Sequence, residues 1–367
     1  MAVMTMERPL VSIIIVNFNG KRFLKECLSA VLGSKYPSFE VIFVDNASSD
    51  KSSDFVSSVF MNNKCLKIIR NRENLGFGPA NNVGFKQAKG DYIVFLNNDT
   101  SVEPEWLAIL VDAMEKDETI GLASPLLLNM DGQTVQTAGI LKSDYMMPSI
   151  WFEMNKDYFK EAFPKVFNIS SAMGAAMIAK RKFLKQIGMF DPKYFYYYDD
   201  DYLSFRTWIA GKRVVTVSGS KVYHFLGGTS GSNDLFKYRY GFIGNASLIF
   251  DIYWNLFDLT KGLFIFFVNR VFYESLLMRK IVRFRGSMSG AFWVLKNLKY
   301  VWRNRLKYWS KAVIDGRTLR SRMIRINIPS SVYLIPKLRS LYFKSETDKY
   351  RKNLFLLYQK ELERTKK

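Results

Sequence analysis

The chain has 367 residues, of which 48% are hydrophobic and 24% charged, with two cysteines and a formal net charge of +21. This length predicts two units, or one large domain with an appendage, at roughly 100–200 residues per domain. The composition excludes wholesale disorder and a disulfide scaffold, because the hydrophobic fraction is ordinary and two cysteines are too few. Cys27 and Cys65 have no metal-ligand spacing, and so few cysteines fit a reducing cytosolic environment.

The positive charge is concentrated in the last third of the chain. Residues 231–367 carry 28 Lys and Arg against nine Asp and Glu, whereas residues 1–230 carry 26 against 24. Such asymmetry predicts an anionic partner for the tail, either nucleic acid or a membrane surface.

Targeting segments are not expected. The apolar run Leu10–Val16 is short and leads into Asn17 without a small-residue cleavage site, so it does not read as a signal peptide. The most apolar part of the tail is interrupted by Asp251, Asp258 and Lys261, whereas a spanning helix needs about 20 mostly apolar residues. We therefore expect a cytoplasmic protein.

The first hundred residues alternate short apolar runs with helix-length segments, which is typical of a parallel sheet with crossover helices. The predicted strands are Val11–Val16, Val41–Val44, Leu66–Arg70 and Tyr92–Leu96, and the predicted helices are Lys21–Leu32, Asp50–Phe60 and Pro79–Ala88. Polar residues follow every strand, and ligands bind at the carboxyl ends of parallel strands. Turn and capping chemistry accounts for any one of these clusters, but four at one edge predict a single binding site.

The segment 76–82 is a glycine-containing loop entering a helix, with Pro79 suited to the first helical turn. It lacks the G-K-[ST] ending of a phosphate-binding P-loop and the G-x-G-x-x-G spacing of a dinucleotide fingerprint. Two functions therefore remain possible for this loop: it starts the following helix, or it also binds a ligand.

Asp99 follows the last of these strands and is the first candidate for metal binding. A carboxylate with neighbouring amide oxygens suits Mg²⁺ or Mn²⁺, which retain water and bridge substrate phosphates. The alternative is that Asp99 caps the helix expected after Glu103.

Asp199, Asp200 and Asp201 stand next to four aromatic residues, Phe195–Tyr198, and before a segment of helical spacing. Mutual repulsion and partial desolvation should raise at least one carboxyl pKa toward the range of a general base. The alternative is a solvated acidic face.

His224 is the only histidine, between a strand-like run at 214–217 and a Gly-Gly-Thr-Ser-Gly segment that resembles a closing loop. A lone histidine is more often a structural residue than a ligand, so the interpretation of His224 as a ligand depends on the segments around it.

Seven segments together resemble the family 2 glycosyltransferases of GT-A fold, especially the rhamnosyltransferase-like subgroup of surface-glycan assembly. They span residues 9–231 and read VSIIIVNFNG, VIFVDNASSD, NRENLGFGPANN, GDYIVFLNNDT, GAAMIAKRKFLKQIGMFD, YYYDDDYLSFR and VYHFLGGTSG. The resemblance implies an α/β GT-A catalytic domain over residues 1–231, with a Rossmann-like, mostly parallel sheet and flanking helices. It further implies inverting, Mg²⁺- or Mn²⁺-dependent transfer from a nucleotide sugar, with dTDP-rhamnose as one candidate, to a lipid-linked or surface-glycan acceptor.

The resemblance also implies the site residues. Asp99 matches the principal metal ligand, His224 a residue that completes the metal or diphosphate site, and Asp199-Asp200 an acidic pair whose second member is the base. The subgroup's further acid is replaced by Tyr202, and Asp201 is an additional one, so all three aspartates remain candidates for the base. The positions assigned to the nucleotide are Asn17, Asn19, Asp45, Asn74, Gly76, Asn81 and Asn98.

Residues 232–367 are expected to form a mainly helical, amphipathic region on the inner face of the cell membrane. Lys and Arg interleaved with Trp, Phe and Leu combine apolar burial with attraction to anionic lipid. Nucleic acid is not expected as a partner, because no nucleic-acid module is apparent and Ile249–Phe272 is too apolar for a phosphate-tracking groove. A basic nucleic-acid-binding protein and a non-catalytic sugar-nucleotide-binding subunit are the alternative functions.

Overall fold

The computed structural model describes residues 8–60, 62–140, 142–143, 154–155, 164–197, 199–225, 234–253, 255–268, 270–271, 281–316, 318–319 and 325–326. The strands are β1 (Val11–Asn17), β2 (Phe39–Asp45), β3 (Leu66–Arg70), β4 (Tyr92–Asn97), β5 (Thr100–Val102), β6 (Ile120–Leu128), β7 (Thr134–Thr137), β8 (Lys142–Ser143), β9 (Met154–Asn155), β10 (Val166–Asn168), β11 (Ala176–Lys180), β12 (Arg213–His224) and β13 (Arg325–Ile326). The helices are α1 (Lys21–Leu32), α2 (Ser52–Phe60), α3 (Phe77–Gln87), α4 (Trp106–Lys116), α6 (Arg181–Ile187), α7 (Asp199–Ile209), α8 (Asp234–Ile252), α9 (Leu256–Phe267), α10 (Ile281–Lys296) and α11 (Leu298–Trp309).

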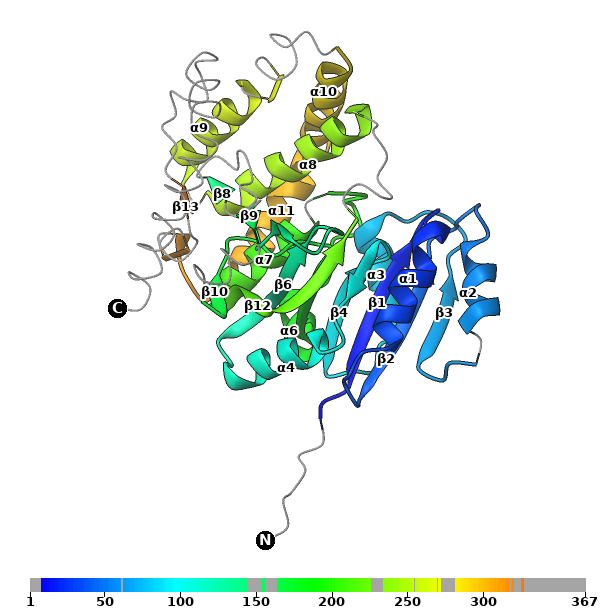
Figure 1. The fold of residues 1–367 in the computed structure, drawn as a ribbon. Coiled ribbons are helices and arrows are strands. Elements are labelled where there is room, and N and C mark those ends of the chain that lie inside the picture. Colours follow the sequence, from blue (N-terminus) through cyan, green and yellow to red (C-terminus); the bar gives the residue numbers. More distant parts are fainter. Residues whose placement is uncertain are drawn as a thin grey trace.

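Most of the strands form one mixed sheet with the order β10-β12-β6-β11-β4-β1-β2-β3 (Figure 1). Strands β3, β2, β1 and β4 are parallel, as the alternating pattern of the first hundred residues predicts. Strand β11 lies antiparallel between β4 and β6, and β12 then runs parallel to β6. The α/β class and the parallel half of the sheet are therefore confirmed, while the second half is mixed.

The predicted strands and helices of this half are all present, with shifts only at their ends. Helix α1 has the predicted bounds and ends at Gly33. Helix α3 begins at Phe77, two residues before the predicted start, so Pro79 lies in its first turn. Asp99 does not cap the next helix, because strand β5 follows it and α4 begins only at Trp106.

The sheet separates two apolar layers, because the side chains of a strand point alternately to its two faces. On one face, Ile13 and Ile15 of β1 pack in a cluster with residues of α1, α2 and α4. On the other face, Ile14 packs in a cluster with residues of α3, α6 and α7. Every β1 residue from Val11 to Ile15 is fully buried, as expected for a strand covered on both sides.

Helices α8 and α11 contact α7, and α9 and α10 pack against α8, above the sheet in the view of Figure 1. The second half of α8 is buried without interruption from Gly241 to Ile252 and belongs to the same apolar cluster as α7. The Trp309 indole Nε1 donates to the Asp251 carbonyl oxygen at 2.6 Å. Helices expected from the tail are thus present in its described part, and they share an apolar core with α7 and the sheet.

None of the helices in the described part of the chain has the length and apolar character needed to cross a membrane.

Candidate active site

The carboxyl ends of β1, β2 and β4 are joined by direct side-chain hydrogen bonds. The fully buried Asn17 amide donates to Asp45 Oδ1 at 3.3 Å and to Ser48 Oγ at 3.0 Å. The Asn98 amide donates in turn to Asn17 Oδ1 at 2.5 Å. These contacts form because parallel strands in register end at the same edge, where Asn17 lies opposite Asp45. Three of the predicted nucleotide-site residues therefore lie in one polar network.

Asn46 connects this network to the loop before α3. Its amide nitrogen donates to Asn74 Oδ1 at 2.8 Å and to the Gly76 carbonyl oxygen at 3.2 Å. Its amide oxygen accepts hydrogen bonds from the Leu75 backbone N–H and from Asn71. Asn46 is a binding-site candidate that the sequence reasoning missed, although it stands beside Asp45 in a polar cluster that the reasoning did single out.

A cavity of about 520 Å³ opens at this edge of the sheet. One wall is polar and comes from the ends of β2 and β4 and from the loop before α3, namely Asn46, Asn74, Gly76, Asn97 and Asn98. The opposite wall is aromatic and comes from the segment before α7 and from α8, namely Phe195, Tyr196, Tyr197 and Phe236. Asp199 and Asp200 also line the cavity, so the predicted acidic pair and part of the predicted nucleotide site face the same space.

The other predicted nucleotide-site residues are placed differently. Asn19 does not line the cavity, but its backbone N–H donates to Ser48 Oγ of the network at 2.9 Å, and its side-chain oxygen accepts a hydrogen bond from the Ser49 backbone N–H at 2.8 Å. Asn81 is buried in α3 and donates to the Phe77 carbonyl oxygen of its own helix at 3.0 Å. The geometry thus groups six of the seven positions and leaves Asn81 apart.

Gly76 sets the path of the chain at the mouth of the cavity. Its φ of +87° and ψ of 178° lie in a backbone region that is essentially restricted to glycine. A Cβ added there would stand 2.1 Å from the Phe195 carbonyl oxygen. The same carbonyl accepts a hydrogen bond from the Phe77 backbone N–H, so Gly76 permits the two walls to meet.

Replacing Gly76 by alanine is therefore expected to destabilise the fold by about 1–3 kcal/mol through backbone strain, before any cost of the clash. Urea unfolding followed by circular dichroism measures this change. Gly219→Ala is the matched control, because its φ is not positive and an added Cβ would meet only Ile109 at an ordinary 3.5 Å. An unchanged midpoint for Gly76→Ala would contradict the assigned backbone.

The carboxyl groups at the start of α7 have different environments. Burial raises the pKa of the Asp199 carboxyl well above its usual value, and the charges of Asp200 and Asp191 raise that pKa further. Asp200 is only half-buried, and its Oδ2 accepts a hydrogen bond from the Gly174 backbone N–H at 2.8 Å. The predicted rise of at least one pKa is therefore confirmed, and it falls on Asp199.

The raised pKa of Asp199 has a consequence for stability. The folded protein keeps the Asp199 carboxyl protonated above pH ~4, where an unfolded chain loses that proton. The contribution of Asp199 to the free energy of unfolding is therefore full at low pH and declines as the pH rises toward the folded pKa. Asp199→Asn has no carboxyl group at this position and therefore lacks the decline. Within that pH window, we expect the free energy of unfolding of Asp199→Asn to rise relative to that of wild type by about 1.4 kcal/mol for each pH unit. Denaturant midpoints from pH 4 to pH 9 test this, with the exposed Glu118→Gln as control. A constant difference between Asp199→Asn and wild type would refute it.

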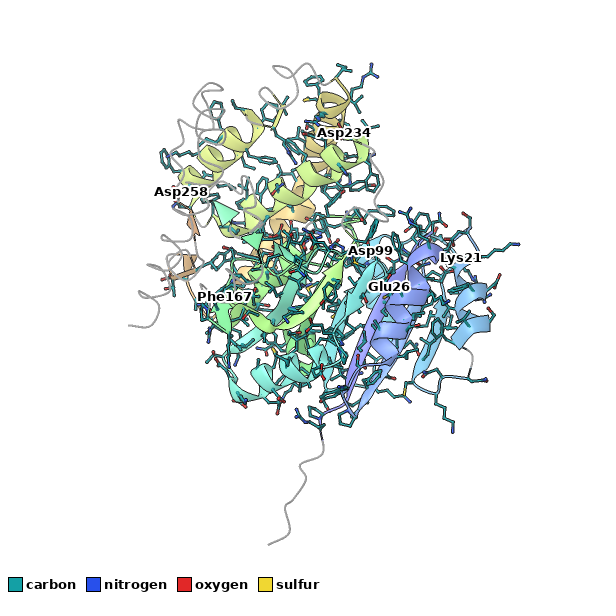
Figure 2. All side chains as sticks on the ribbon, in the orientation of Figure 1. Lys21, Glu26, Asp99, Phe167, Asp234 and Asp258 are labelled. Carbon is teal, nitrogen blue, oxygen red and sulfur yellow. The ribbon has the colours of Figure 1, made fainter. Side chains whose placement is uncertain are left out.

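The predicted metal ligands Asp99 and His224 lie together beside the cavity network. His224 Nε2 is 3.4 Å from Asp99 Oδ1, and the two side chains are only 6% and 2% exposed. Asp99 Oδ1 makes no hydrogen bond within the described residues. Figure 2 shows Asp99 at the end of the sheet that faces the C-terminal helices. Asp99 follows Asn98 in the chain, but neither Asp99 nor His224 lines the cavity.

Gln136 of β7 holds His224 and was not foreseen from the sequence. Its side-chain oxygen lies 2.7 Å from His224 Nδ1, and its amide nitrogen donates to the His224 carbonyl oxygen at 3.0 Å. The two residues are 88 positions apart, and no spacing or motif in the sequence indicates this contact.

Comparison with known proteins agrees with this arrangement. The family model "Glycosyl transferase family 2" matches residues 12–188. The chain is 28% identical over 144 residues to an uncharacterized glycosyltransferase of Haemophilus influenzae, which covers 39% of this chain and 43% of that protein. It is 28% identical over 112 residues to the glycosyltransferase GlyG of Streptococcus pneumoniae, which covers 30% of this chain and 37% of GlyG. The chain thus spans less than half the length of these curated relatives.

Two solved structures share the fold. GalNAc-T7, solved with UDP, GalNAc and Mn²⁺, has a TM-score of 0.54 at 18% identity and covers 80% of this chain and 57% of its own. TarS of S. aureus has a TM-score of 0.51 at 17% identity and covers 93% of this chain and 54% of its own. The chain is thus similar to family 2 glycosyltransferases over residues 12–188 and shares its fold with these two solved glycosyltransferase structures, which agrees with the resemblance seen in the sequence. The rhamnosyltransferase-like subgroup stays a prediction.

Proposed function

We propose that the chain is an inverting glycosyltransferase that moves a sugar from a nucleotide-sugar donor to a lipid-linked or surface-glycan acceptor. The observation that carries this proposal is the single cavity that joins the polar strand ends to Asp199 and Asp200. The strand ends offer amide donors and acceptors for a nucleotide, and the aromatic wall offers rings on which a sugar can stack. dTDP-rhamnose remains one candidate donor.

Asp200 is the proposed general base. It is the most exposed of the three aspartates, since Asp199 and Asp201 are 5% and 4% exposed. Its two oxygens accept backbone hydrogen bonds from Gly174 and Asp201, which favour the charged form and orient the carboxylate. Burial raises the pKa of the Asp199 carboxyl, which disfavours a second negative charge beside Asp200. A single carboxylate that removes the acceptor proton as the acceptor attacks leads to inversion.

Tyr202, which replaces the further acid of the subgroup, does not argue for a non-catalytic subunit. Its ring is 3% exposed and stacks on Tyr194 with 4.9 Å between ring centroids. The side chain therefore belongs to the core below the site, and the position offers no group to substrate.

Asp99 and His224 fit a divalent cation. They supply one oxygen and one nitrogen donor, and the buried Asp99 Oδ1 lacks a hydrogen bond within the part of the chain that is described. The described residues contain no cluster of three or more His, Cys, Asp or Glu suited to a metal, which leaves further ligand positions to phosphate oxygens and water. Bound there, Mg²⁺ or Mn²⁺ would neutralise the charge that develops on the departing nucleoside diphosphate.

Transfer and hydrolysis assays with a panel of UDP-, GDP- and dTDP-sugars test the proposed function. Turnover of one donor that depends on Asp200 supports it. Tight donor binding with neither hydrolysis nor transfer would favour the non-catalytic subunit.

The C-terminal helices support the proposal of a peripheral position on the inner membrane face. On α11 an exposed apolar stripe, Leu298, Trp302 and Leu306, runs beside an exposed basic stripe, Lys299, Arg303 and Lys307. Apolar burial and attraction to anionic lipid would act together on such a helix. We call these six residues the α11 surface.

Liposome flotation of the full chain checks this prediction. We expect binding to anionic vesicles that weakens at high salt, and loss of binding when Lys299, Arg303 and Lys307 are all changed to Gln. Lys25, Lys51 and Lys64, exposed on the distant half, changed together to Gln, are the matched control. A chain cut near Ser232 is unsuitable, because it would uncover the apolar core that α7 shares with α8. Tight RNA binding without flotation would favour the nucleic-acid alternative.

A further inference from the structure

The contact between Gln136 and His224 involves both ends of the glutamine amide. Nε2 donates to the His224 carbonyl oxygen at 3.0 Å and to Asn129 Oδ1 at 3.1 Å, while Oε1 lies 2.7 Å from His224 Nδ1. Gln136 is 3% exposed and His224 is 5% exposed, so water does not compete for these groups. The amide therefore has one well-defined set of partners.

The orientation of this amide follows from the backbone. A carbonyl oxygen accepts hydrogen bonds and never donates one, so the glutamine atom that faces the His224 carbonyl must be the nitrogen. The atom that faces Nδ1 is then the oxygen, which only accepts. His224 Nδ1 must therefore carry a hydrogen.

We infer that Gln136 is a positioning residue that keeps a hydrogen on His224 Nδ1 and places Nε2 beside Asp99. Nε2 lies 3.4 Å from Asp99 Oδ1, a buried oxygen that makes no hydrogen bond within the described ranges. A lone pair and a carboxylate oxygen aimed at one another are unfavourable unless positive charge lies between them. Gln136 thus prepares this pair for a cation, as second partners of ligating histidines generally do.

The tautomer can be measured without any metal and without activity. Because His224 is the only histidine in the chain, labelling with ¹⁵N-histidine yields a single ring whose nitrogen shifts identify its protonation state. We expect the spectrum of wild type to show a hydrogen on Nδ1. A ring without a hydrogen on Nδ1 would overturn the inference, whatever the variants do.

Three variants separate positioning from simple structural support. Gln136→Glu keeps an acceptor for Nδ1–H and should retain the hydrogen on Nδ1, although it loses the hydrogen bond donated to the His224 carbonyl oxygen. Gln136→Leu removes the acceptor and should lose the preference. Gln133→Leu, at an exposed glutamine just before β7, is the matched control and should leave the spectrum unchanged. An unaltered tautomer in folded Gln136→Leu would also refute the positioning function.

The consequence for a cation rests on the proposed function and has a separate test. Added Mn²⁺ alone should broaden the His224 ring signals, and Gln136→Leu should need about 10–100-fold more Mn²⁺ for equal broadening. The expected tautomer without broadening would uphold the positioning by Gln136 and remove the metal from the proposed function.

Discussion

Asp200→Asn is expected to lower the transfer rate by about 10²–10⁴-fold while donor affinity changes little. The substitution removes the group that would accept the proton from the acceptor hydroxyl, but it keeps the shape of the side chain and an oxygen for one of its two backbone hydrogen bonds. Steady-state transfer at saturating donor measures the rate, and calorimetry with the nucleoside diphosphate measures binding.

The neighbouring aspartates serve as controls for this result. Asp199 also lines the cavity, but burial and the neighbouring charges raise its pKa, which disfavours its negative charge, so Asp199→Asn should retain most of the turnover. Asp201 is buried and does not line the cavity, so Asp201→Asn should be milder than Asp200→Asn. A collapse of turnover in either control, with normal turnover in Asp200→Asn, would show that the base was wrongly chosen.

Asp99→Ala is expected to abolish the part of donor binding that depends on Mn²⁺, whereas His224→Ala should weaken it less. Asp99 supplies the charged oxygen donor, which a hard cation prefers, and His224 supplies a single neutral nitrogen. Calorimetric titration of the nucleoside diphosphate with and without Mn²⁺ measures the metal-dependent part.

Asp99→Asn distinguishes loss of the charge from loss of the fold at this buried position. It preserves the volume of the side chain and leaves the hydrogen bond from the Phe225 backbone N–H to the residue 99 carbonyl in place. We expect it to fold as wild type and still to lose most metal-dependent binding. Equal affinity of wild type with and without Mn²⁺ would exclude a metal from donor binding.

The periodicity of the sequence was sufficient for the first half of the sheet. Buried parallel strands are short, continuous apolar runs bounded by polar loops, so Val11–Val16 and Tyr92–Leu96 could be located within a residue or two. The direction of β11 could not be predicted, because an apolar run has the same pattern whichever way its strand runs. The mixed second half of the sheet was missed for this reason.

The candidate site, like the sheet, could be predicted from the sequence only in part. Residue chemistry and the resemblance brought Asp99, Asp199, Asp200 and His224 into the set of candidates, because each stands at the end of a strand or at the start of a helix. The unequal environments of the three adjacent aspartates depend on which carboxyl α7 turns toward the core. That choice is made by packing, and it is what raises the pKa of Asp199 rather than that of another member of the cluster.

The sequence by itself determined the α/β class, the glycosyltransferase resemblance and the edge of the sheet that carries the site. These follow from local patterns, since strand ends, loops and acidic clusters are contiguous in the chain. Only the tertiary structure decided that Asn46 joins the network, that Phe236 of α8 completes the cavity and that Gln136 holds His224. Each of these is a contact between segments far apart in the sequence, and such contacts are selected by the packing of the whole chain.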